Sequence, residues 1–217
     1  MNKSFLISML LLLSSVTICA QTTVSRGVPK DGHYMVDLGL SVKWATCNVG
    51  ADYPEEYGRW FSWGETQPRQ NYDDKTYKYY QKKRFSEGEY TKYNNSDGKK
   101  RLEKSDDCAY MQWGGAWRMP TLDEAQELIE KCRWEKCDIN GISGTRVIGP
   151  NGNSIFIPYA GRRYDKELVE TGETGNFWTS SLQSFDIAIG IRIDYNSKGH
   201  RYNVGRTCGH SIRPVCP

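Results

Sequence analysis

The stretch from Trp113 to Leu128 constrains the fold more than any other part of the sequence. Gly114 and Gly115 allow a tight backbone turn between two large indoles, those of Trp113 and Trp117. Side chains of this size are costly to leave in water and are normally packed into a core. The sequence therefore predicts a buried corner at this point of the chain.

A capped helix should follow this corner. Pro120 disfavours helical backbone at the residue before it, so the extended segment that carries Arg118 should end there. Thr121 has the profile of an N-cap, and Glu124 three residues later completes a T-x-x-E capping box. The apolar residues that follow recur at helical spacing and offer one stripe to a core: Leu122, Ala125, Leu128 and Ile129. This local chemistry is structural rather than catalytic.

Residues 1–20 are typical of an export signal. Lys3 gives a positive start, Phe5 to Val16 is apolar, and Ala20 suits cleavage. The apolar run is too short for a comfortable membrane span, and nothing comparable follows it. Cys19 raises the alternative of a lipid anchor, but a bulky isoleucine precedes it, which favours a cleaved product. We expect an exported protein that is periplasmic, displayed on the cell surface or secreted.

Charge gives no case for nucleic acid as a partner. Removing residues 1–20, which hold one lysine and no acid, lowers the formal charge from +3 to +2. Residues 72–107 mix basic and aromatic side chains, as binders of single-stranded nucleic acid or acidic glycans do. Interspersed acids dilute that charge, so we interpret the segment as a solvated excursion on the surface.

Cysteine usage fits an exported chain. Six cysteines remain after the signal, an even number that favours disulfides or buried thiols, and the sequence cannot choose the pairing. No C-x-x-C motif occurs, so we predict no metal site. The six are Cys47, Cys108, Cys132, Cys137, Cys208 and Cys216.

The order of elements predicts an α+β fold with an antiparallel sheet. Residues 21–33 resemble a polar tether, and residues 34–217 form one domain. Alternation predicts strands at 34–48, which includes Trp44, and at 187–193, 200–204 and 211–215. Residues 145–148 and 154–157 flank an Asn-Gly turn and should form a hairpin. The aromatic residues between 53 and 63 could line a sugar-binding surface, although core packing is favoured.

The residues offer no catalytic constellation. His33, His200 and His210 stand in no metal-binding or nucleophile motif, and a dyad of a histidine with Cys208 is conceivable only in space. No nucleophile elbow, Walker or dinucleotide-binding motif is present. The sequence therefore favours a binding or structural role, with no cofactor. An oxidase or hydrolase and a structural subunit of a surface assembly remain alternatives.

Several motifs occur together in one order along the chain. They are Asp37-Leu-Gly-Leu-Ser-Val-Lys-Trp44, Trp63-Gly-Glu65, Trp113-Gly-Gly-Ala-Trp-Arg-Met-Pro-Thr121, Gly152-Asn-Ser-Ile-Phe-Ile-Pro158, Phe177-Trp-Thr-Ser-Ser181 and Ser211-Ile-Arg-Pro-Val215. In this set the chain resembles the Fibrobacter succinogenes major paralogous domain family, whose relatives are abundant among exported proteins of gut Bacteroidota. The resemblance covers residues 34–215.

This resemblance implies a C-type-lectin-like fold with long irregular loops and an exported recognition or adhesion module that binds a protein or glycan. It places ligand contacts between Trp178 and Arg213, with these candidates: Trp178, Tyr195, Arg201, Tyr202, Asn203 and Arg206. Tyrosine, arginine and asparagine suit adaptable recognition. No calcium-binding Glu-Pro-Asn or Trp-Asn-Asp triplet occurs, and no cysteine pair of the related formylglycine-generating enzymes can be placed.

Overall fold

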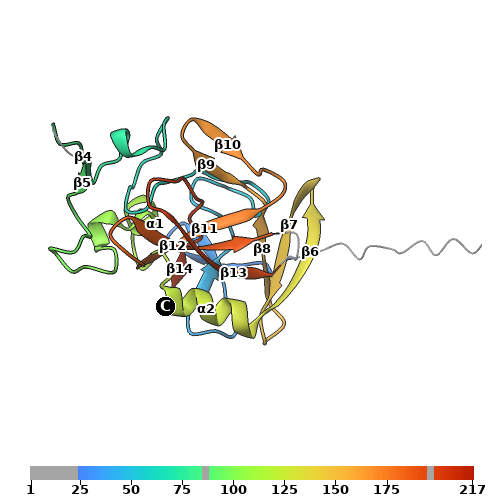
Figure 1. The fold of residues 1–217 in the computed structure, drawn as a ribbon. Helices are drawn as coiled ribbons and strands as arrows, with labels where there is room; N and C mark the ends of the chain where they lie inside the picture. Colours follow the sequence, from blue (N-terminus) through green and yellow to red (C-terminus); the bar gives the residue numbers. More distant parts are fainter. Residues whose placement is uncertain (1–23, 85–87, 195–197) are drawn as a thin grey trace, which may run out of the picture.

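The computed structural model describes residues 24–84, 88–194 and 198–217 (Figure 1). Three predictions lie outside the described residues: the signal segment with Cys19, the candidate Tyr195, and Asn196 and Ser197 of the expected turn at 196–199. Among the described residues, no helix combines the length and apolarity that crossing a membrane requires.

A four-stranded antiparallel sheet joins the two ends of the domain. Its order is β1 (Val28–Lys30), β2 (His33–Val36), β3 (Lys43–Ala45) and β14 (Val215–Cys216). Two predictions are corrected here. Residues 34–48 form two strands rather than one, because the chain turns back between them with Gly39 at φ 75°. Part of the expected tether at 21–33 is the edge strand β1 of this sheet.

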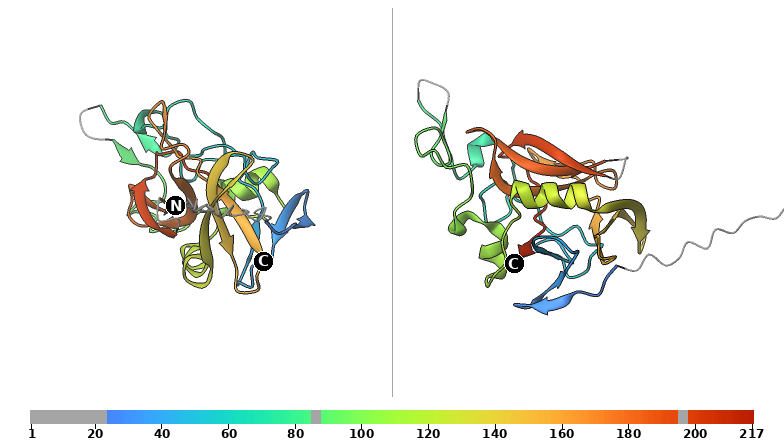
Figure 2. Two further views of the ribbon diagram at one scale, coloured as in Figure 1. Left: turned by 90° about the vertical axis from the view of Figure 1, so that its right-hand side faces the viewer. Right: turned by 90° about the horizontal axis from the view of Figure 1, so that it is seen from below.

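A three-stranded antiparallel sheet forms the second layer, in the order β11 (Gly175–Leu182), β12 (Ile187–Ile193) and β13 (Gly199–Gly205). Helix α2 (Leu122–Lys131) packs against this sheet and is seen end to end in Figure 2. The strand expected at 211–215 is shorter than predicted, since only its last residue belongs to β14.

The third sheet contains the predicted hairpin. Strands β7 (Ile142–Ile148) and β8 (Ser154–Pro158) pair with Ile148 opposite Ser154, which confirms the Asn-Gly turn. Strand β6 (Arg133–Ile139) extends the sheet on the other side of β7, and the sequence interpretation missed it. Strand β6 is mostly polar and none of its residues is fully buried, so its sequence carries little apolar alternation.

Short elements fill the remaining loops. They are η1 (Asp74–Thr76), β4 (Tyr80–Gln81), β5 (Glu89–Tyr90), η2 (Lys104–Asp106), α1 (Cys108–Trp113), β9 (Arg162–Tyr164) and β10 (Glu167–Val169). Strands β4 and β5 project from the body of the molecule (Figures 1 and 2). The ladders between described strands are antiparallel, so the molecule is an α+β protein in which strands predominate.

The predicted corner and helix cap are present as drawn from the sequence. Trp44, Trp117 and Pro120 are buried, whereas Trp113 is half-buried and stacks on His33 with ring centroids 3.7 Å apart. The Thr121 hydroxyl accepts the N–H of Glu124, and the Glu124 carboxylate accepts the N–H of Thr121. The same carboxylate receives both terminal nitrogens of Arg118, at 2.5 and 2.7 Å.

The interior of the described structure holds two large cores of different chemistry, besides a small cluster of Ala45, Trp117 and Cys216. The aliphatic core lies between α2 and the sheets and is built from Val36, Leu38, Leu128, Ile155, Ile191, Val215 and their neighbours. The aromatic core lies beside β11 and contains Phe61, Trp63, Tyr77, Tyr79, Tyr93 and Trp178. The prediction that residues 72–107 form a solvated surface segment is therefore wrong in part, since four of their tyrosines are buried: Tyr72, Tyr77, Tyr79 and Tyr93.

Of the two alternatives that the sequence left open for the cysteines, disulfides or buried thiols, the described residues show the second. Cys47, Cys108, Cys132, Cys208 and Cys216 are buried as free thiols. Burial raises the pKa of Cys132 to about 11 and raises that of Cys108 further. Apolar packing rather than covalent bonding accounts for their placement, because a thiol behaves as a small hydrophobic group.

Candidate functional site

Strand β13 separates the candidates that were predicted to act together. Tyr202 lies opposite Gly190, whereas Arg201 and Asn203 lie opposite Ile191 and Ile189. Since side chains alternate along a strand, Tyr202 points to one face of the sheet and its two neighbours to the other. Arg201 and Asn203 are exposed and bonded to each other, from Nε to Oδ1 at 3.2 Å.

Trp178 and Arg206 are interior residues, which corrects their assignment to a binding surface. Both have 0% exposure. The indole N–H of Trp178 donates to the carbonyl of Phe61 at 2.7 Å. Arg206 donates to the Tyr77 hydroxyl at 2.9 Å and to the carbonyl oxygens of Tyr93 and Phe185 at 3.1 and 2.8 Å.

Aromatic rings surround the buried Arg206 guanidinium. Its Cζ atom lies 4.7 to 5.8 Å from the centroids of five rings: Trp63, Tyr77, Tyr79, Tyr90 and Tyr93. A cation over ring faces is stabilised by the ring quadrupoles without a carboxylate. Arg206 therefore organises the aromatic core.

Tyr202 covers a ring stack that leads into the interior. His210 lies between Trp178 and Tyr202, nearly parallel to both, with ring centroids 4.2 and 6.4 Å away. Burial, with Arg162 and Arg192 nearby, lowers the pKa of His210 to about 3. These two arginines share the Glu170 carboxylate, which they contact at 3.2 and 2.7 Å. Half-buried and tied into this packing, Tyr202 supports the fold.

A hollow on the surface lies away from these residues. Its volume is about 690 Å³, and it opens between η1 and the turn that joins β9 to β10. None of the five candidates among the described residues lines it. The lining residues are Asn71, Asp73, Asp74, Lys75, Tyr164, Asp165, Lys166 and Glu167.

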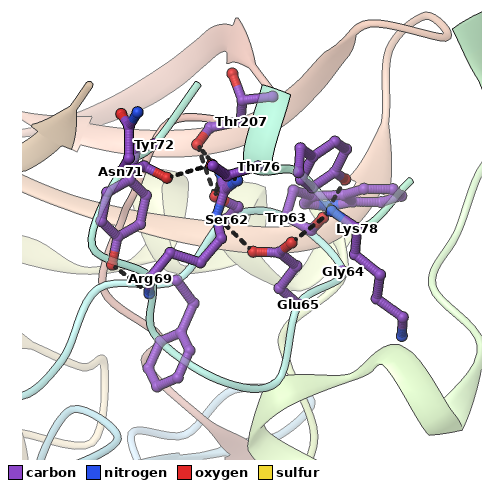
Figure 3. Close-up of polar contacts among 12 residues, drawn as sticks. Ser62, Trp63, Gly64, Glu65, Arg69, Asn71, Tyr72, Thr76, Lys78 and Thr207 are labelled. Carbon is purple, nitrogen blue, oxygen red and sulfur yellow. Dashed lines mark hydrogen bonds and ion pairs between the residues drawn. The ribbon is translucent and has the colours of Figure 1, made fainter. Parts of the chain in front are cut away.

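A buried ion pair holds the loop that forms one wall of this hollow (Figure 3). Arg69 Nε contacts a Glu65 carboxylate oxygen at 2.7 Å, and the other Glu65 oxygen accepts the N–H of Lys78 at 2.8 Å. Burial raises the pKa of Glu65 despite both partners. Charged groups with so little exposure persist only when paired and hydrogen-bonded, as here.

The remaining Arg69 nitrogens fix the rest of the wall. One terminal nitrogen donates to the Thr76 hydroxyl at 2.9 Å and to the Asp73 carbonyl at 3.2 Å. The other donates to the Ser62 hydroxyl and the Thr207 carbonyl (Figure 3). The loop that carries η1 is thereby tied to the segment after β13.

The polar groups of this wall are arranged in advance. Asp73 accepts the N–H of Thr76 at 3.1 Å and the side-chain amide of Asn71 at 2.8 Å. Its burial is slight, and these hydrogen bonds outweigh it and lower the pKa of Asp73. The side-chain oxygen of Asn71 is buried without a hydrogen-bond partner among the described residues. Asp74 accepts the Tyr90 hydroxyl at 3.2 Å.

The opposite wall is the tip of a two-residue hairpin turn. Strands β9 and β10 pair with Tyr164 opposite Glu167, which leaves Asp165 and Lys166 as the turn. The backbone N–H of Tyr72 donates to the Asp165 carbonyl at 2.7 Å and joins the two walls. The Tyr164 side chain is 55% exposed at this rim. An exposed ring beside carboxylates, an amide and ammonium groups therefore lines a concave surface.

Sequence reasoning missed this site for a physical reason. Its residues come from two segments nearly 90 positions apart that only the fold brings together. The Asp-Lys turn between two short β-rich segments at 162–169 was the one local signal that could have marked the hairpin.

Cys208 and His210, which could have formed a catalytic dyad, are both buried. Within the described ranges, no three histidine, cysteine or acidic side chains are grouped to hold a metal ion. Burial raises the pKa of the Cys208 thiol, and the His210 ring nitrogens have no hydrogen-bond partner there. The Cys208–histidine dyad considered from the sequence thus lacks an activated thiolate.

Comparisons of the chain with protein-family models, with curated proteins and with solved structures found no match.

Proposed function

We propose that this protein is an exported, non-enzymatic recognition module of C-type-lectin-like fold that binds a carbohydrate. The hollow between η1 and the β9–β10 turn holds the ligand. The observation that carries the proposal is the exposed Tyr164 ring beside preorganised carboxylate and amide groups.

Three features support the fold assignment. The last strand, β14, returns beside β3 near the start of the domain. A capped helix follows the Arg-x-Pro-Thr turn. Long irregular loops connect η1 to α1, and the regular elements described within them are short: β4, β5 and η2. Each feature agrees with what the family resemblance implies.

The chemistry of the hollow favours a sugar over a protein partner. Sugar hydroxyls donate to carboxylates such as Asp74 and Glu167 and accept from ammonium groups such as Lys75. The apolar face of a pyranose ring packs on an aromatic ring such as Tyr164, which loses little conformational entropy on binding. A protein partner would instead require a wider and more apolar surface.

Glycan-array screening followed by titration calorimetry tests the proposal. Tyr164→Ala and Asp74→Asn should each weaken binding of a neutral oligosaccharide by about tenfold or more, equivalent to about 1.4 kcal/mol. Tyr53→Ala is the matched control, because this tyrosine is 63% exposed but lies outside the hollow.

The outcomes separate the alternatives. Binding that Tyr53→Ala leaves intact and Tyr164→Ala removes supports the hollow. Binding that resists Tyr164→Ala but is lost in Arg201→Ala and Asn203→Ala returns the site to β13, as the resemblance implies. Failure to bind any glycan on the array contradicts the proposal.

A further inference from the structure

A second concavity lies beside the N-terminal end of α1. Its volume is about 410 Å³. Three separate segments are stitched together around it: Leu102 N–H donates to the Ser180 carbonyl at 2.9 Å, and Arg118 N–H donates to the Val215 carbonyl at 3.1 Å. We name it the α1 groove.

The body of the α1 groove is largely apolar. Leu102, Tyr110, Ala116 and Trp117 contribute to its lining. Trp117 is buried, with its indole N–H donating to the Lys30 carbonyl at 3.0 Å, so it forms a rigid floor. A concave apolar surface of a few hundred Å³ with a small number of polar groups is the usual form of a small-molecule site.

Two of the charged residues that line the groove are already satisfied by the protein. The buried Asp107 carboxylate accepts the N–H groups of Tyr110 and Met119 at 2.9 to 3.1 Å. Arg118 is held by Glu124 through both terminal nitrogens. Neither group requires a ligand for its charge.

The other two, Arg101 and Lys104, are uncompensated cations. Both are exposed, and no carboxylate of the described chain forms a salt bridge with either. Their neighbours differ, since Lys92 and Lys99 both pair with Glu103. Lys104 Nζ lies 4.1 Å from the centroid of the Tyr110 ring, which holds the ammonium at the groove.

We propose that the α1 groove binds a small organic anion, a planar apolar body that carries a carboxylate. The apolar body lies against Leu102, Ala116 and the Tyr110 ring, and the carboxylate receives charge-assisted hydrogen bonds from Arg101 and Lys104. This site is separate from the carbohydrate hollow, so neither proposal depends on the other.

Calorimetric titration with a matched pair of probes tests the site. Indole-3-acetate carries the carboxylate, and indole-3-acetamide has the same shape without the charge. The carboxylate should bind about tenfold more tightly than the amide. In the double variant Arg101→Gln/Lys104→Gln this preference should disappear, while the affinity for the amide stays unchanged.

A charge-matched variant controls for long-range attraction. Lys82→Gln/Lys136→Gln removes two exposed cations outside the groove and should keep the tenfold preference. Equal affinity of the wild-type protein for both probes, loss of preference in this control, or no detectable binding of either probe overturns the proposal. Circular dichroism should show that both variants stay folded, because all four substituted side chains are exposed.

Discussion

The two large cores of this molecule are packed with side chains of different chemistry. The aliphatic core joins α2 to the sheets mainly through valine, leucine and isoleucine side chains, although Trp44 and Tyr159 also belong to it. The aromatic core fills the space among loops, and its rings surround a buried guanidinium. Aliphatic packing tolerates exchange at constant volume, whereas a core built around hydrogen bonds depends on one particular side chain.

The sharpest test of this difference is Arg206→Met. The substitution keeps a long side chain but leaves the carbonyl oxygens of Tyr93 and Phe185 without their donor. We expect a loss of about 3–5 kcal/mol in the free energy of unfolding. Urea denaturation followed by tryptophan fluorescence measures it. A loss below about 1 kcal/mol would show that the hydrogen bonds and ring contacts of the Arg206 guanidinium contribute little to stability.

Acid should weaken the ring stack that flanks the aromatic core. The pKa of His210 is lowered to about 3 in the folded protein, whereas the pKa of a histidine in the unfolded chain is about 6.5. The contribution of the buried, neutral His210 to the free energy of unfolding is therefore complete above about pH 6.5 and is lost as the pH falls toward about 3. Between pH 7 and pH 4 we expect a loss of about 3 kcal/mol.

His210→Phe isolates this contribution. The variant should retain the stack with Trp178 and show a flatter stability profile between pH 6.5 and pH 4.5, measured by urea denaturation at each pH. The pKa values of Asp106 and Glu170 are lowered to about 2, so their contributions to stability are lost at more acidic pH than that of His210. That more acidic loss should be the same in the variant and in the wild-type protein. An unchanged slope in the variant would assign the acid sensitivity to other groups.

The aliphatic core should respond weakly to the equivalent exchange. Leu128→Met preserves volume at a fully buried position of α2. The expected cost is below about 1.5 kcal/mol, because no polar group loses a partner. The same denaturation experiment measures it, and a cost as large as that of Arg206→Met would remove the distinction between the two cores.

The smallest loss of stability should come from a change at the N-terminus of α2. Thr121→Ala removes the hydroxyl that accepts the N–H of Glu124. We expect a loss of about 1 kcal/mol, seen as a small decrease in Tm. Thr121→Ser retains the cap and should be nearly neutral, so an equal loss in both variants would argue against the hydrogen bond as the cause.

Prediction from sequence followed the same division between the cores. The α2 stripe, the β7–β8 hairpin and strand β12 were predictable, because their apolar residues recur at the period of helix or strand. The aromatic core was predictable only at Phe61 and Trp63, for which core packing was favoured. Tyr77, Tyr79 and Tyr93 were not, since they stand among lysines and acids in a segment without periodicity. A tyrosine among charges has the same local sequence whether it is buried or exposed.

The site was harder still to anticipate. Arg201, Tyr202 and Asn203 are adjacent in sequence and were predicted to share one binding surface. The alternation of side chains along β13 places Tyr202 on the opposite face of the sheet from the other two. Trp178 and Arg206 have the residue types of ligand contacts, and the core uses the same properties internally. The hollow at Tyr164 depends on contacts between distant segments, which a single sequence does not encode locally.

The pairing of β14 with β3 has a consequence for how the chain reaches its folded state. Val215 lies opposite Trp44, so the first sheet lacks a strand until residue 215 has been made. Contacts so far apart in sequence form late, because the intervening chain must first be closed into a loop. A chain that is synthesised from its N-terminus therefore completes its first sheet only after the helices and the other two large sheets have been made.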